Sequence, residues 1–194
     1  MKLSGSYQIN LEKQKVWEAL NDPEVLKKSI PGCEEFIKNS ETEFTATATN
    51  KIGPFNASFT GEIKLEQINA PNSYVIQGSG NSPVGFASGE AKVKLEDFEE
   101  GTKLFYEVDA NVGGKIAQVG SRLIDMTAKK MADIFFGNFS QLISKENINN
   151  KTLAAVENEV QMKVEKDISK IKINKLIIYA SGAVILIILG FLII

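Results

Sequence analysis

The sequence predicts an α+β fold in which a curved antiparallel sheet wraps round one long C-terminal helix, followed by a C-terminal transmembrane helix. Three observations lead to this prediction. Between residues 43 and 111, successive segments alternate apolar and polar side chains with period two, and short turns join them. A long stretch with the apolar periodicity of a helix follows. The last nineteen residues contain no charged side chain.

Composition narrows the range of functions. The chain of 194 residues has a net charge of −2, so it has no basic excess with which to bind nucleic acid. It has one cysteine and therefore no intrachain disulfide. The absence of histidine removes Ser–His–Asp triads, the common zinc sites and the usual general base near neutral pH. We therefore expect no metal site and no enzyme activity, although Asp, Glu, Lys and Tyr remain available for acid–base chemistry.

The first elements are one strand and two short helices. Residues 3–10 have strand character, and residues 11–21 place Leu11, Val16 and Leu20 at helical spacing. A second short helix starts at Asp22-Pro23, because an Asp cap followed by Pro is a helix-start signal. It stops before Gly32.

Five strands are predicted next, and they form meander hairpins because only short turns separate them. They cover residues 43–51, 55–68, 73–80, 89–98 and 103–111. Apolar side chains share one parity in each strand, so one face of the sheet is buried and the other is wet. The run from Gly78 to Phe86 is interpreted as a flexible hairpin tip. It is either an ordinary turn or a gate in which Phe86 touches a ligand, and Phe55 has the same two interpretations.

The long helix is predicted to run from about residue 115 to about residue 144. Its buried arc consists of Ile116, Gly120, Leu123, Thr127, Met131 and Ile134. An adjoining apolar flank contains Ala117, Ile124, Ala128, Phe135 and Phe139. Asp125, Lys129 and Asp133 are placed on the far side. A sheet round such a helix leaves an apolar tunnel where side chains are small. We predict that the six arc residues, with Phe55 and Phe86, line a hydrophobic ligand cavity.

The C-terminal region divides into two parts. Residues 146–175 are rich in Asn, Lys and Glu and carry a narrow apolar stripe from Val156 to Ile168. This stripe fits a partly helical linker, a helix lying on the membrane surface or a self-associating coil. Residues 176–194 span about 28 Å as a helix, close to the thickness of the bilayer hydrocarbon. We therefore predict a domain at 1–145, a polar linker at 146–175 and a transmembrane anchor at 176–194.

The orientation of this anchor follows from its flanks. Lys166, Lys170, Lys172 and Lys175 precede the span, so the positive-inside rule places residues 1–175 in the cytoplasm. The first ten residues contain no long apolar region of the kind that makes a secretory signal. We expect a single-pass C-terminal anchor that holds the domain at the cytoplasmic face of the cell membrane.

Four long collinear blocks of the chain are distinctive: MKLSGSY at the start, VWEALNDPEVLKKSIPGCE from Val16, GFASGEAKVKL from Gly85, and VDANVGGKIAQVGSRLIDMTAKKMADIFFGNF from Val108. These blocks closely resemble the CoxG family, the G subunit of carbon monoxide dehydrogenase, within the START/Bet v 1-like (SRPBCC) superfamily. The resemblance covers about residues 1–145. It implies the helix-grip fold and a small accessory protein that works beside molybdenum hydroxylases of the CO dehydrogenase type.

The resemblance also implies a lipophilic cavity, for which a respiratory quinone is an attractive ligand, and it supplies no catalytic residue. Three functions remain open. The first is a membrane-anchored carrier that presents a hydrophobic molecule to a molybdenum-containing dehydrogenase. The second is a purely structural adaptor that recruits that enzyme without a ligand. The third is an enzyme of the aromatase/cyclase kind, which requires ionisable groups inside the tunnel.

Overall fold

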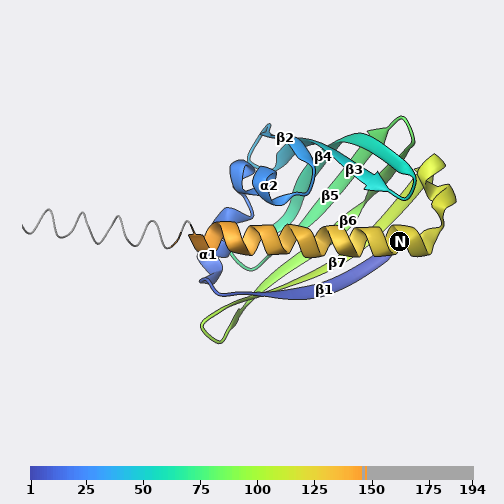
Figure 1. Ribbon diagram of the computed structural model, residues 1–194. Coiled ribbons are helices and arrows are strands. Elements are labelled where there is room, and N and C mark those ends of the chain that lie inside the picture. The colour runs from blue at the N-terminus through green and yellow to red at the C-terminus, as the bar shows by residue number, and fades with distance from the viewer. Residues whose placement is uncertain (146, 148–194) are drawn as a thin grey trace, which may run out of the picture. The chain divides into compact units, whose positions relative to one another are not determined.

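The computed structural model of the protein describes residues 1–145 and 147. Seven antiparallel strands form one curved sheet in the order β1-β7-β6-β5-β4-β3-β2, and a long helix lies across its concave face (Figure 1). The strands are β1 (Lys2–Ile9), β2 (Cys33–Lys38), β3 (Glu43–Ile52), β4 (Phe55–Asn69), β5 (Ser73–Ser82), β6 (Gly85–Phe98) and β7 (Gly101–Gly114). This is the curved-sheet arrangement that the alternating segments predict.

Two short helices follow β1 and cover one end of the concave face: α1 (Lys13–Ala19) and α2 (Pro23–Ser29). Asp22 caps α2, because its carboxylate accepts hydrogen bonds from the amides of Glu24 at 2.8 Å and Val25 at 3.3 Å. The Asn138 side chain of the long helix donates a hydrogen bond to the Ser29 carbonyl at 3.2 Å. The end of α2 is therefore tied to the long helix.

The long helix begins later than predicted. A 3₁₀ helix, η1 (Lys115–Val119), comes first, and the α-helix occupies residues 121–145. Gly120 lies between them with φ of +88°, a left-handed conformation that favours glycine and interrupts the helical ladder. The predicted start at residue 115 is therefore wrong by about six residues.

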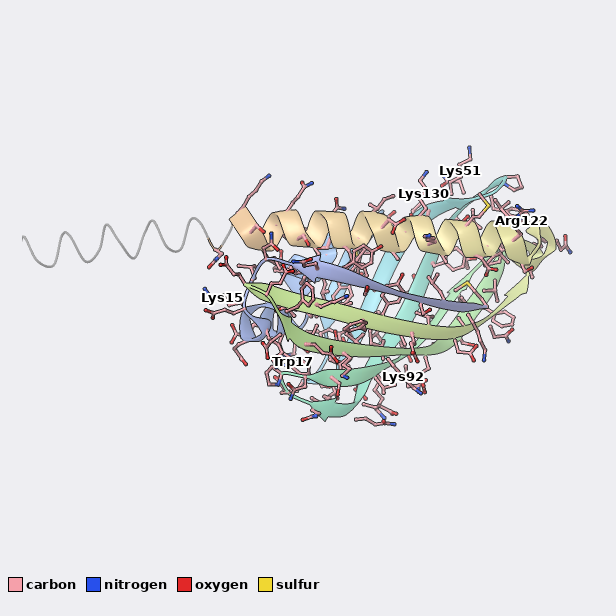
Figure 2. The ribbon with its side chains drawn as sticks, turned by 90° about the horizontal axis from the view of Figure 1, so that it is seen from below. Lys15, Trp17, Lys51, Lys92, Arg122 and Lys130 are labelled. Atoms are coloured by element: carbon pink, nitrogen blue, oxygen red, sulfur yellow. The ribbon has the colours of Figure 1, made fainter. Side chains whose placement is uncertain are left out.

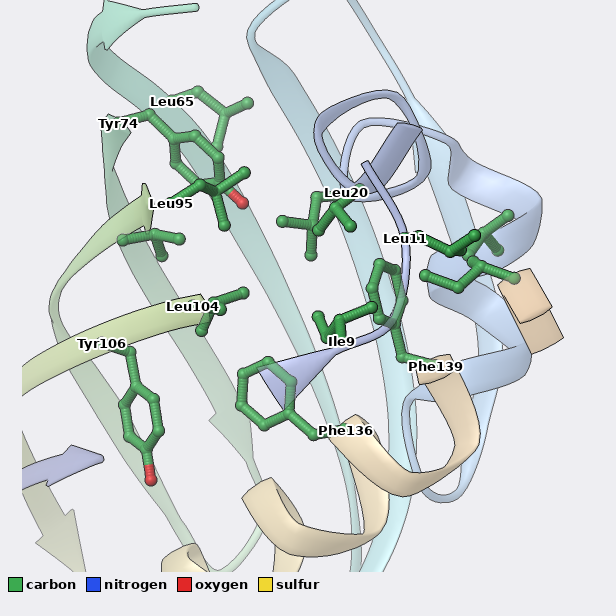
Figure 3. Packing of buried hydrophobic residues seen from close by; sticks show 14 of the residues in the cluster. Ile9, Leu11, Leu20, Leu65, Tyr74, Leu95, Leu104, Tyr106, Phe136 and Phe139 are labelled. Atoms are coloured by element: carbon green, nitrogen blue, oxygen red, sulfur yellow. The ribbon is translucent and has the colours of Figure 1, made fainter. Parts of the chain in front are cut away.

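The face of this helix that enters the core is also rotated from the predicted arc. Phe136, Phe139 and Ile143 are buried, whereas Leu123 and Ile134 are 36% and 38% exposed. Figure 3 shows Phe136 and Phe139 directed toward Ile9 and the sheet. Phe139 belongs to the predicted flank, whereas Phe136 and Ile143 lie beyond that flank, farther round the helix from the arc. Periodicity alone does not distinguish two adjoining apolar faces.

Two further expectations about the sheet need correction. The sequence predicted no strand at β2, an edge strand in which Phe36 alone is buried, so its alternating pattern is weak. The run from Gly78 to Phe86 is not a long flexible tip. Nearly all of it belongs to the paired strands β5 and β6, and the turn contains only Pro83 and Val84.

The predicted linker and anchor fall outside the described residues, apart from Asn147. Within the described part, no helix is both long and apolar enough to cross a membrane. The first 146 residues, Met1–Glu146, form one compact unit.

Candidate functional site

Side chains on the concave face of the sheet change from large to small along the strands. At the end covered by α1 and α2, large apolar side chains fill the core: Leu65, Tyr74, Val93, Leu95, Leu104 and Tyr106. Toward the other end, the cross-strand rows on the same face contain mainly glycine and alanine: Ala46, Gly61, Gly78, Gly80, Ala87, Gly89 and Ala110. Because these side chains are small, they do not fill the distance between the sheet and the long helix at this end.

The space above β5 is open at two of these glycines, Gly78 and Gly80. A Cβ atom added to Gly78 would meet no heavy atom within 4 Å. At Gly80 the nearest atom, the Thr60 carbonyl oxygen, would lie 3.8 Å away. The long helix therefore does not touch the sheet here. Consistent with this, Ile63, Ile76 and Val108 face inward but remain partly exposed.

The helical wall of this space comes from the first half of the long helix. Ile124, Ala128 and Met131 are half-buried and apolar. The hydroxyl of Thr127 donates a hydrogen bond to the Leu123 carbonyl at 2.8 Å, so this side chain is already satisfied within the helix. We call the region between this wall and the small-residue half of the sheet the concave space. Its lining is mainly apolar, as expected of a site for a hydrophobic molecule.

A polar cluster joins β1, β7 and the long helix, and the Tyr106 hydroxyl lies beside Gly5 of β1. The Tyr7 hydroxyl donates a hydrogen bond to the Asp133 carboxylate, and the Tyr7 ring stacks on Phe136 with centroids 4.1 Å apart. Tyr106 belongs to the same aromatic cluster, with its ring centroid 5.7 Å from that of Phe136. Tyr106 is 9% exposed, and its hydroxyl bonds to no other described residue yet is reached by solvent. It is therefore an available hydrogen-bond donor.

The tyrosines of this cluster are suited to hydrogen bonding rather than to acid–base catalysis. Burial raises the pKa of Tyr7, and the hydrogen bond and negative charge of Asp133 raise it further. Burial also raises the pKa of Tyr106, with a smaller contribution from Asp133. Both phenols therefore keep their protons near neutral pH.

Replacing Asp133 by asparagine is expected to lower the pKa of Tyr7, because it removes the nearby negative charge. The pKa of Tyr7 in the folded protein lies above its ordinary value of about 10. The protonated Tyr7 therefore contributes its full share to folding stability below about pH 10. Stability declines as the pH rises further, since the unfolded chain then loses its proton first. D133N should reduce that decline. Urea unfolding of the full chain between about pH 9 and about pH 12 measures this effect.

The matched control is Asp125→Asn, which removes the same charge from an exposed position on the same helix. D125N should leave the titration of Tyr7 unchanged. Identical stability–pH profiles for D133N and the unmodified protein up to about pH 12 would show that Asp133 does not act on Tyr7.

The structure separates the eight residues predicted to line a cavity. Ile116 is 3% exposed and packs beside Gly85 at the β5–β6 turn. Phe55 is half-buried at the start of β4, on the parity that faces inward. Thr127 and Met131 are half-buried on the helical wall of the concave space. These four lie at the concave space or at its open end.

The other four lie at its margin or away from it. Leu123 lies beside the β3–β4 turn, because its Cδ2 would be 3.1 Å from a Cβ on Gly53. Gly120 separates the two helices, and Ile134 is 38% exposed. Phe86 lies against Gly113 on the outward parity of the sheet and is 42% exposed. Phe86 therefore faces away from the concave space.

Sequence reasoning missed the residues that create the space. Gly78 and Gly80 occupy alternate positions of β5, and Gly61 and Gly89 oppose them on neighbouring strands. Small residues at every second position of β5 could have indicated this space. The same glycines, however, also fit a turn. The Tyr7–Asp133 pair joins residues 126 positions apart, and no local pattern indicates it.

Other features of the described residues offer no competing site. A hollow of about 660 Å³ on the outer face of the sheet is lined mainly by polar side chains, including Thr45, Glu62, Lys64, Gln77 and Ser79. It contains none of the eight predicted residues. In the described part of the chain, no group of three or more Cys, Asp or Glu side chains is placed to hold a metal ion.

Comparison with known proteins assigns the family. The profile of CoxG, the G subunit of carbon monoxide dehydrogenase, matches residues 5–144. The chain belongs to the CoxG family. The resemblance seen in the sequence blocks is thereby confirmed, and among curated proteins no match to the chain is found.

Solved structures similar to this CoxG-family domain share its helix-grip fold. A conserved protein from Geobacillus kaustophilus is 28% identical with a TM-score of 0.71, and the match covers 75% of this chain and 96% of that one. Ara h 8.0201 is 16% identical with a TM-score of 0.54 and coverages of 75% and 98%. The Zhui aromatase/cyclase from Streptomyces sp. R1128 is 13% identical with a TM-score of 0.52 and coverages of 75% and 94%.

The Geobacillus comparison also bears on the independence of the domain. The match covers nearly all of that chain, and Met1–Glu146 makes up the same 75% share of this one. A chain of this extent therefore folds without a segment equivalent to residues 147–194. We therefore expect residues 1–146, which form one compact unit, to fold without the rest of the chain.

Proposed function

We propose that this protein is a membrane-anchored accessory protein that binds a hydrophobic ligand, of the quinone class, in the concave space. The observation that carries the proposal is the open, mainly apolar space above Gly78 and Gly80 in a CoxG-family domain. Burial of apolar ligand surface supplies about 25 cal/mol per Å² of driving force.

The proposal includes a partner and a location. CoxG takes its family name from carbon monoxide dehydrogenase, and we propose that the protein couples a molybdenum hydroxylase of this type to the membrane. Residues 176–194 act as a single-pass anchor, with the domain at the cytoplasmic face. No covalent cofactor is needed for this role, because the quinone is bound reversibly.

Native mass spectrometry with lipid extraction tests ligand binding. Residues 1–146 purified from quinone-producing cells are expected to carry about one isoprenoid quinone per chain. Met131→Lys should remove it, because a charge in an apolar site carries a large desolvation cost. Gly137→Lys, which puts the same charge on an exposed part of the same helix, should keep it.

An empty domain that also refuses added quinone would overturn the carrier proposal. The structural adaptor, which recruits the dehydrogenase through surface contacts alone, would then be the better account. Circular dichroism of both variants shows whether the fold survives, so that loss of ligand is not confused with loss of structure.

A further inference from the structure

Three basic side chains on the outer face of the sheet are paired with carboxylates. Lys64 lies 2.9 Å from Glu66, Lys92 lies 3.8 Å from Glu90, and Lys94 lies 2.6 Å from Glu96. Each pair joins residues two apart on one strand, which share a face. The charges of these three lysines are therefore balanced locally.

Three basic side chains at the end of β3 and on the first half of the long helix are not paired in this way. Lys51, Arg122 and Lys130 make no ion pair with any carboxylate of the described part. Arg122 and Lys130 share a stripe of the long helix with Met126, because the three are spaced four residues apart. Figure 2 shows both cations along that helix, with Lys51 at the end of β3 in the same part of the molecule.

Exposed apolar side chains lie among these cations. Met126 is 62% exposed and Leu123 is 36% exposed. Leu123 also joins the helix to the hairpin that carries Lys51, since its Cδ2 would be 3.1 Å from a Cβ on Gly53. We call the five residues Lys51, Arg122, Leu123, Met126 and Lys130 the basic corner.

Acidic groups do not cancel the charge of the basic corner. Asp125 is the nearest acid along the helix, and the adjacent Lys129 offsets it. Asp133 lies seven residues from Met126 and so near it on the helix surface, but its carboxylate accepts the hydrogen bond from Tyr7. The whole chain has a net charge of −2, so any attraction to anions comes from this local distribution.

Unpaired cations around exposed Met and Leu match the chemistry of an anionic lipid interface. The cations meet lipid headgroups, and the apolar side chains reach the acyl boundary. The basic corner also adjoins the first half of the long helix, which is the wall of the concave space. We propose that the basic corner docks the domain on an anionic bilayer, so that the ligand of the proposed function passes directly between lipid and the concave space.

The anchor proposed at 176–194 would bind vesicles by itself, so the test uses residues 1–146.

Vesicle binding of residues 1–146 tests the proposal. Co-sedimentation with phosphatidylcholine vesicles containing phosphatidylserine is expected, and binding to phosphatidylcholine alone should be much weaker. Each cation near an anionic surface contributes about a fivefold gain in partitioning, so K51Q/R122Q/K130Q should lose about a hundredfold. The matched control K64Q/K92Q/K94Q removes the same charge from the outer face and should bind within about threefold of the unmodified domain.

The outcomes separate docking from ligand binding. Equal loss in the two triple variants, or no preference for anionic vesicles, would overturn the docking proposal. Binding to an acidic protein surface in place of both vesicle types would also overturn it. Quinone content is measured on the same samples, so a quinone-loaded domain that ignores vesicles fails only the docking proposal. An empty domain that still docks through the basic corner fails only the carrier proposal.

Discussion

Leucine in place of Gly78 is expected to weaken ligand binding strongly while leaving the domain folded. The added side chain would extend into the concave space, where a Cβ at this position meets no heavy atom within 4 Å. It would therefore fill the volume that a ligand needs, and affinity should fall at least about tenfold. Stability should stay the same or rise by about 0.5–1 kcal/mol, because glycine inside a strand is unfavourable.

The matched control for this variant is Ser79→Leu. Ser79 is the next residue of β5, and consecutive side chains of a strand point to opposite faces. S79L adds the same apolar group to the outer face and should leave ligand affinity unchanged. Calorimetric titration of residues 1–146 with decylubiquinone measures both variants. Unchanged binding by G78L in a folded domain would show that the ligand does not occupy the space above Gly78.

Alanine in place of Phe139 is expected to have the largest effect on stability. The Phe139 side chain is fully buried, at 0% exposure, and stacks with Phe135 at a centroid distance of 5.8 Å. Its removal leaves a cavity between the long helix, β1 and the short helices, with a cost of about 3–5 kcal/mol. Domains of this size have total stabilities of about 5–15 kcal/mol, so the variant loses a large part of its stability.

Urea unfolding followed by the fluorescence of Trp17 measures this loss. Trp17 is the single tryptophan and packs edge-on against Tyr74 at 5.2 Å, so it reports on the same core. Phe86→Ala provides the control, because Phe86 is 42% exposed and its removal should cost less than about 1 kcal/mol. Similar losses in F139A and F86A would contradict the assignment of the core to this face of the helix.

Local patterns were sufficient to predict much of the fold. Strands β3 to β7 were predicted within a few residues, apart from β6, which begins four residues earlier than expected. The Asp22-Pro23 start of α2 was also predicted correctly, because capping and proline geometry act within a few residues. The family blocks indicated the helix-grip arrangement, which the CoxG profile and the solved structures confirm.

The concave space was only partly predictable. A hydrophobic cavity under the long helix was expected, but its lining was assigned to a helix arc that lies away from the buried face of Phe136, Phe139 and Ile143. Both faces of the helix are apolar, and only packing of Phe136 and Phe139 against the sheet chooses between them. Gly78 and Gly80 fit both a turn and a small-residue floor, and cross-strand pairing with Gly89 and Gly61 decides this.

Local sequence patterns were enough to establish the order of most elements and to show that apolar side chains lie on one face of the sheet. Composition was enough to exclude sites that require histidine. Contacts between distant segments, in contrast, settle which residues border the concave space, that Tyr7 meets Asp133, and which cations remain unpaired. The reason is distance along the chain. Helix rotation, cross-strand register and charge pairing depend on segments that fold together from far apart, and no local pattern records them.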